Sequence, residues 1–160
     1  MIHNNPTDHG PHIADIRAEK EQRARWLYFL VTEARKRGHS DEFALAAIRA
    51  CGQYAGGQKT PTTDTYELAK AFTGKNSYKV FEIDETVTED ELNLEFHYCP
   101  LVAAWQKLTD DEALIADLCA IAMEGDFGEA DMFPAFEFTL SETIAKGDRT
   151  CKMCFRKKEQ

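Results

Sequence analysis

The spacing of the hydrophobic residues changes along this chain, and that change constrains the fold more than any other feature. Helices are predicted where apolar residues recur every three or four positions, over 14–37, 40–56, 64–72, 100–108 and 110–126. Strands are predicted where apolar and polar residues alternate, over 78–84, 91–98, 133–141 and 150–157. Because the strands come in pairs and the helices are segregated from them, the pattern predicts an α+β fold with an antiparallel sheet.

The predicted fold has about four strands packed with about five helices in a single domain, since 160 residues are too few for two comfortable domains. This domain spans 13–160, with a helical part at 13–75 and a part of sheet and helices at 76–157. Residues 1–12 are polar and contain prolines, a glycine and three histidines, which favours a flexible arm. A metal site formed by these histidines is the alternative for the arm.

The composition excludes several classes of partner. The net charge is −9, with 28 acidic and 19 basic residues, so the chain lacks the basic face that a nucleic-acid binder needs. No apolar run approaches the roughly 20 residues of a membrane span, and the N-terminus does not have the pattern of a signal peptide. We therefore expect a cytoplasmic protein with no nucleic-acid or membrane partner. Its five cysteines, an odd number, are expected to be reduced thiols.

The stretch EFHYCPLVAAW, at 95–105, places Cys99 where a strand meets a helix. Proline is favoured as the first residue of a helix, so Pro100 makes Cys99 the expected N-cap. The N–H groups and the dipole of a helix start favour a thiolate, which predicts a lowered pKa for Cys99. His97 is two positions earlier on the same strand, so both side chains are expected on one face. The alternative is a cysteine that only fills the corner.

The other cysteines are interpreted mainly as structural. Cys51 and Cys119 lie on helices and are expected to pack there. Cys151 and Cys154 form a C-x-x-C pair on a predicted strand, where residues three apart point to opposite faces. These two sulfurs therefore cannot hold one metal ion between them.

A second polar cluster is MEGDFGEAD, at 123–131. Gly125 and Gly128 are predicted to break the preceding helix, which leaves Glu124 and Asp126 at its C-terminal end. The helix dipole disfavours carboxylates there, so these acids are candidates for a function. The alternative is a solvated glycine-rich turn.

Taken together, the blocks HYCPLVAAWQKL, LCAIAMEGDFG and FEFTLSETIAKGD, with the cysteine that follows them, resemble the L-2-amino-thiazoline-4-carboxylic acid hydrolase family. The resemblance covers roughly 78–156. It implies a hydrolase that opens 2-amino-thiazoline-4-carboxylate, or another small cyclic amidine or amide, to a carbamoyl-cysteine or its counterpart. On matching positions it points to Cys99, to Glu124 and Asp126, and to Cys151.

Two mechanisms fit this chemistry. In the covalent route Cys99 attacks the ring carbon, His97, Asp126 and Glu124 move protons, and no cofactor or metal is needed. The alternative is a single zinc ion held by His97 and Cys99, with a third ligand among Cys151, Asp126 and Glu137. Candidates for contact with the substrate are Glu137, Arg149 and Cys151, and candidate cations for the substrate carboxylate are Lys146, Arg149 and Arg156.

Two other classes of function stay open. A sheet backed by helices can bind a small molecule without turning it over, in a pocket lined by strand phenylalanines. The chain can also serve as an accessory subunit of a neighbouring enzyme. The N-terminal helices carry an apolar belt, from which a homo-oligomer is expected; the belt consists of Trp26, Tyr28, Phe29 and Leu30.

Overall fold

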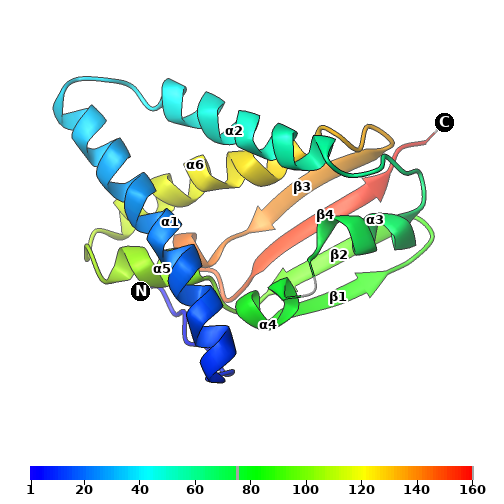
Figure 1. Cartoon of the computed structure of the whole chain (residues 1–160), viewed down its shortest axis with the longest axis horizontal. Helices are drawn as coiled ribbons and strands as arrows, with labels where there is room; N and C mark the ends of the chain where they lie inside the picture. Colours follow the sequence, from blue (N-terminus) through cyan, green and yellow to red (C-terminus); the bar gives the residue numbers. More distant parts are fainter. Residues whose placement is uncertain (75, 160) are drawn as a thin grey trace.

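The computed structural model describes residues 1–74 and 76–159 and contains one four-stranded sheet with helices packed against it (Figure 1). The strand order is β1-β2-β4-β3, and every neighbouring pair is antiparallel. The strands are β1 (Ile83–Val87), β2 (Glu91–Phe96), β3 (Phe136–Glu142) and β4 (Cys151–Lys157). The described part of the chain has six α-helices and a 3-10 turn: α1 (Pro11–Lys36), α2 (Glu42–Gly57), α3 (Thr65–Phe72), α4 (Ser77–Phe81), α5 (Pro100–Gln106), α6 (Glu112–Ala130) and η1 (Ile144–Lys146). The predicted α+β class is confirmed.

The hydrophobic core has two parts. One lies between the sheet and α3, where Leu92, Leu94 and Phe155 from the strands meet Leu68. The other lies among α1, α5 and α6 around Trp105, whose indole N–H donates to a helix carbonyl 2.9 Å away. The alternation predicted for β2 and β4 is confirmed, because their inward residues are buried and their outward ones are not.

The strand predicted at 78–84 is wrong over most of its length. Residues 77–81 form the short helix α4, and β1 begins only at Ile83. Glu82, between them, adopts the left-handed conformation with φ of 53°, which ends the helix. The apparent alternation arises because Val80 is buried and its neighbours are less so, and a five-residue helix is too short to show a helical period.

The predicted helix break at Gly125 and Gly128 is also wrong, since α6 continues to Ala130. These glycines allow close packing with α2. A Cβ atom on Gly128 would lie 2.1 Å from the carbonyl oxygen of Arg49, and one on Gly52 would lie 1.9 Å from that of Gly125. The two helices therefore pack backbone against backbone, which requires glycine at the contact.

The N-terminal segment, residues 1–10, lies against the body of the protein, and α1 begins directly after it at Pro11. Ile2 is buried in the core, and its backbone N–H donates to the carboxylate of Glu112 at 3.0 Å. The Gln106 side chain donates to the carbonyl of Ile2. The segment is docked in this structure, while the flexibility expected from its composition concerns motion and stays a prediction. No described helix is long and apolar enough to span a membrane.

Candidate active site

Cys99 occupies the corner between β2 and α5. Its backbone is extended, with φ −131° and ψ 111°, and Pro100 is the first helical residue, so the predicted N-cap position is confirmed. Its side chain makes no capping hydrogen bond. Burial raises the pKa of the Cys99 thiol, and the N–H groups of Val102 and Leu101 oppose this only in part. The predicted lowering of this pKa is therefore wrong, because lost hydration outweighs the helix start.

Asp126, on α6, is the acidic group best suited to proton transfer, because its pKa is raised and it has no ion pair among the described residues. Burial raises the pKa of its carboxyl to about 7, with a further increase from the charge of Glu129. Its acidic neighbours on the helix are ion-paired instead: Glu124 binds Arg49 at 2.8 Å, and Glu129 binds Lys59. No salt bridge among the described residues involves Asp126. This carboxyl group can therefore both take up and release a proton near neutral pH.

Three thiols and this carboxyl group lie in one region, with Cys119 and Cys151 buried and Cys99 and Asp126 partly exposed. The charge of Asp126 raises the pKa of Cys99, Cys119 and Cys151, and the charge of Cys99 raises the pKa of both other thiols. Cys119 and Cys151 belong to the same core cluster, and Cys99 packs against it. The backbone N–H of Ile144 donates to the Cys151 sulfur at 3.3 Å. The fold thus brings Cys99, Asp126 and Cys151 together, and adds Cys119, which the sequence placed in the core.

The remaining candidates lie elsewhere. The imidazole Nε2 of His97 lies 2.9 Å from the carboxylate of Asp84, both partly or largely exposed, so this ring faces Asp84 and not the thiol. Glu124 is held by Arg49. Glu137 and Arg149 are exposed, Glu137 on the outward face of β3 and Arg149 in the loop before β4.

The C-x-x-C pair divides between the two faces of β4, as predicted: Cys151 is buried, while Cys154 lies opposite Asn93 and Thr139 in the sheet. Within residues 1–74 and 76–159, no group of three or more His, Cys, Asp or Glu side chains is placed to hold a metal ion.

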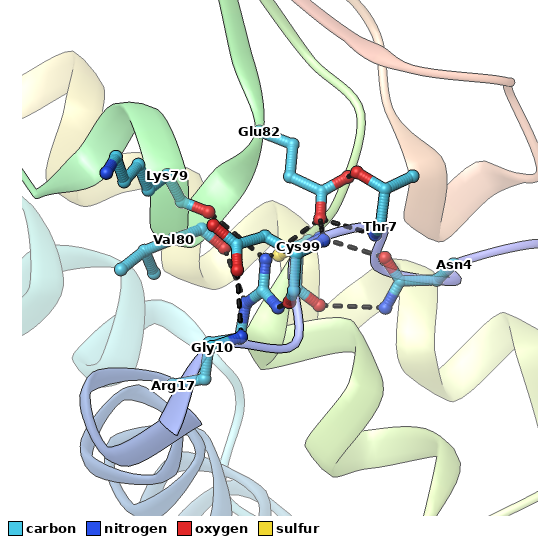
Figure 2. A network of polar contacts seen from close by, with 9 residues as sticks. Asn4, Thr7, Gly10, Arg17, Lys79, Val80, Glu82 and Cys99 are labelled. Atoms are coloured by element: carbon cyan, nitrogen blue, oxygen red, sulfur yellow. Dashed lines mark hydrogen bonds and ion pairs between the residues drawn. The ribbon is translucent and has the colours of Figure 1, made fainter. Parts of the chain in front are cut away.

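One side chain of the N-terminal segment makes hydrogen bonds with the backbone of Cys99 (Figure 2). The amide of Asn4 donates from Nδ2 to the carbonyl oxygen of Cys99 at 2.8 Å. Its Oδ1 accepts from the backbone N–H of Cys99, also at 2.8 Å. Asn4 is buried at 9% exposure. Sequence reasoning missed this contact, because the two residues are 95 positions apart and no local motif marks Asn4.

A buried ion pair fixes the same segment further along (Figure 2). Glu82 accepts hydrogen bonds from the backbone N–H groups of Thr7 at 2.6 Å and Asp8 at 3.0 Å, and pairs with Arg17 at 3.0 Å. Burial alone would raise the pKa of Glu82, but these hydrogen bonds lower it below its usual value. Arg17 also donates to the carbonyls of Asp8, Lys79 and Val80 and lies over the ring of Tyr98.

Two depressions of the surface lie away from the thiol of Cys99. Of two described depressions, one lies on the outward face of the sheet around Lys152 and Asn93, and the other lies between α1 and α6 around Arg35. Neither is lined by Cys99 or Asp126. Cys99 and Asp126 are both partly exposed, and the N-terminal segment is docked beside Cys99.

The fold and the site define a small α+β protein with a cysteine and an aspartate in one partly buried region. Within that class, the chain belongs to the L-2-amino-thiazoline-4-carboxylic acid hydrolase family, whose sequence model matches residues 19–155. The family resemblance found in the sequence is thereby confirmed, and the name of the family indicates a hydrolase. The match includes Cys99, Asp126 and Cys151 but not the N-terminal segment.

No curated protein matches the chain. Among solved structures, one similar chain is trafficking protein particle complex subunit 3 from Naegleria fowleri, which was crystallised covalently bound to palmitic acid. The identity is 18%, the TM-score is 0.39, and the match covers 92% of this chain and 82% of the other. A TM-score of this size does not establish a shared fold.

Proposed function

We propose that this protein hydrolyses a small cyclic amidine such as 2-amino-thiazoline-4-carboxylate, with Cys99 as the nucleophile and Asp126 as the group that moves protons. Membership of the family supports the substrate class. The observation that carries the proposal is a partly buried carboxyl group with a pKa of about 7, free of any ion pair among the described residues, near a partly buried thiol. This replaces His97 with Asp126 as the proton acceptor.

In the first half of the reaction, the Cys99 thiol gives its proton to the Asp126 carboxylate as its sulfur attacks the ring carbon between nitrogen and sulfur. A bond from Cys99 to that carbon forms, and the bond from the carbon to the ring sulfur breaks. The ring sulfur leaves with the proton that Asp126 holds. Since the Cys99 pKa is raised, the thiol is protonated at neutral pH, and a nearby base is what makes it a nucleophile.

In the second half, water attacks the same carbon and gives a proton to Asp126. The bond to Cys99 breaks, and the sulfur recovers a proton from Asp126. The second proton of the water passes to the former ring nitrogen, and the carbon keeps the water oxygen as a carbonyl. The product is therefore a carbamoyl-cysteine, and one water has been consumed. A pKa of about 7 suits a group that must be a base in one step and an acid in the next.

The substrate carboxylate requires a cation, and Arg23 on α1 is the best placed. Its charge lowers the pKa of both Cys99 and Asp126, so it lies near both groups. Among the three cations considered from the sequence, the charge of Lys146 reaches the thiol cluster, while Arg156 is bound to Glu91 at 2.7 Å. We therefore assign substrate binding to Arg23 first and to Lys146 second.

Access to Cys99, which is partly exposed, is bounded on one side by the N-terminal segment. The N-terminal segment is the element whose displacement exposes the start of α5, since Ile2 and Asn4 cover that corner. We propose that it opens to admit the substrate and closes to exclude water from the reacting atoms.

The test is to mix the protein with 2-amino-thiazoline-4-carboxylate, quench with acid, and measure the intact mass alongside product formation. We expect turnover and a transient adduct equal in mass to the substrate, mapped to Cys99 by peptide analysis. Cys154→Ser is the matched control, because that thiol is on the opposite face of the sheet, and it should keep both signals. Turnover without any adduct in either half of the reaction would argue for direct attack by water.

A non-catalytic binding module is the second candidate. The raised pKa of the Cys99 thiol favours it, because a protonated thiol is a weak nucleophile. Tight binding of the thiazoline with no turnover at any pH from about 6 to about 9, on either side of the Asp126 pKa of about 7, would establish this function instead.

A further inference from the structure

The outward face of α2 is apolar along its whole length. Seven uncharged residues on this side of the helix are not covered by the rest of the chain: Phe43, Ala46, Ala47, Ala50, Cys51, Tyr54 and Gly57. We call this set the α2 face. All seven are exposed, with Phe43 at 50% and Tyr54 at 74%. The opposite side of α2 is already used, because Gly52 and Gly56 pack it against the backbone of α6.

A helix that is apolar on all sides is normally buried on all sides. In this chain α2 is covered on one side only, and it lies at the edge of the molecule above α6 (Figure 1). Large exposed apolar patches on soluble proteins mark interaction sites. The outward side of α2 therefore needs a partner from outside the single chain.

The α2 face offers apolar area for a pair of chains. Its two aromatic side chains, Phe43 and Tyr54, are 50% and 74% exposed. At roughly 150–250 Å² for each aromatic side chain, their exposed parts amount to roughly 250 Å². The alanines and Cys51 add to this area, and a standard interface of roughly 800 Å² per partner is only a little over half apolar. The α2 face therefore supplies much of the apolar part of such an interface.

We propose that the α2 face binds a second copy of this chain, with the two α2 helices antiparallel across a two-fold axis at Ala50. Such an interface places the same surface of each copy against the other. With Ala50 on the axis, Tyr54 of one copy lies over Ala46 of the other, and Phe43 lies over Gly57. Each large side chain thus meets a small residue, which is what close packing of two helices requires.

Charge favours the same site. The chain carries a net charge of −9, so two copies repel each other over most of their surfaces. The α2 face has no charged residue, and the one arginine on α2, Arg49, is tied to Glu124 and Asp131 on the side of α6. This face is therefore a place where two copies meet without opposing like charges.

The test is light scattering of the full chain and of Ala50→Glu, which would set two carboxylates against each other at the axis. We expect the wild type at twice 18.2 kDa and the variant at 18.2 kDa. Ala55→Glu is the matched control: Ala55 is exposed on the same helix but five residues away, roughly 140° around it, and it should stay dimeric.

A cysteine cross-link tests the geometry without adding a charge. In a Cys51→Ser background, Ala50→Cys oxidised with copper phenanthroline should give a band at twice the chain mass, and Ala55→Cys should not. This variant also decides the matter where Ala50→Glu does not fold. A monomeric wild type, or dimers that form equally well in Ala50→Glu and show no cross-link in Ala50→Cys, would overturn the proposal.

Discussion

Replacing Asn4 with alanine should expose the Cys99 thiol. The Asn4 amide makes two hydrogen bonds of 2.8 Å with the backbone of Cys99, and both are lost in the variant. At about 1 kcal/mol each, the docked segment loses about 2 kcal/mol relative to the opened state. When closing is faster than alkylation, the alkylation rate of a covered thiol follows the open population. A change of about 2 kcal/mol then raises this rate about 30-fold.

The assay is iodoacetamide labelling followed by peptide mass spectrometry, in a background where Cys51 and Cys154 are serine. Asn5→Ala is the matched control, because Asn5 is the exposed neighbour of Asn4 in the same segment. We expect the labelling rate of Cys99 to rise in Asn4→Ala and to stay at the wild-type value in Asn5→Ala. Equal rates in the two variants, with urea unfolding showing both native, would refute the idea that this segment covers the thiol.

Other expected outcomes concern pH and packing. Turnover should rise with pH through about 7 as Asp126 ionises. The folded pKa of Asp126 lies above the ordinary 3.8, so the protein should lose stability as the pH rises from 3.8 to about 7. Asp126→Asn should therefore lose most of the turnover together with its rise through pH 7. It should also be more stable to urea than the wild type at pH 8, by up to roughly 4 kcal/mol, with no difference below about pH 4. Arg17→Met should lower the free energy of unfolding by about 3–5 kcal/mol, measured in urea, because it leaves Glu82 buried without its partner. Gly52→Ala should cost about 3 kcal/mol or more by thermal unfolding because its Cβ meets the α6 backbone, whereas Gly57→Ala, with only a methionine side chain near, should be neutral or stabilising.

The fold could be predicted where the hydrophobic period was long enough to read. The long helices and the strands β2 and β4 follow from it, because burial on one side of an element leaves a regular trace in the sequence. The helix α4 could not be found this way, since five residues show no period. Gly125 and Gly128 were predicted to end α6 because glycine weakens a helix. Instead, close packing against α2 requires glycine in α6, and no local pattern in the sequence reveals that contact.

The candidate site was predictable in part for similar reasons. Cys99 at the strand–helix corner follows from the proline after it. Asp126 was a candidate from the acidic cluster at 123–131 and from the family resemblance, which also pointed to Cys151. His97 was placed beside Cys99 by strand alternation, but its ring faces Asp84, because the chain turns between the end of β2 and the start of α5. The pKa of Cys99 depended on burial, a long-range property that outweighs the local helix start.

The central claim is that Cys99 is the nucleophile of a ring-opening hydrolase. It is tested most directly by the rate at which purified wild type and Cys99→Ser consume 2-amino-thiazoline-4-carboxylate. We expect turnover by the wild type and a loss of at least about 10³-fold in Cys99→Ser with its fold intact, because a serine hydroxyl is a far weaker nucleophile without its own activating base. Equal turnover by a correctly folded Cys99→Ser, or none by the wild type, would contradict it.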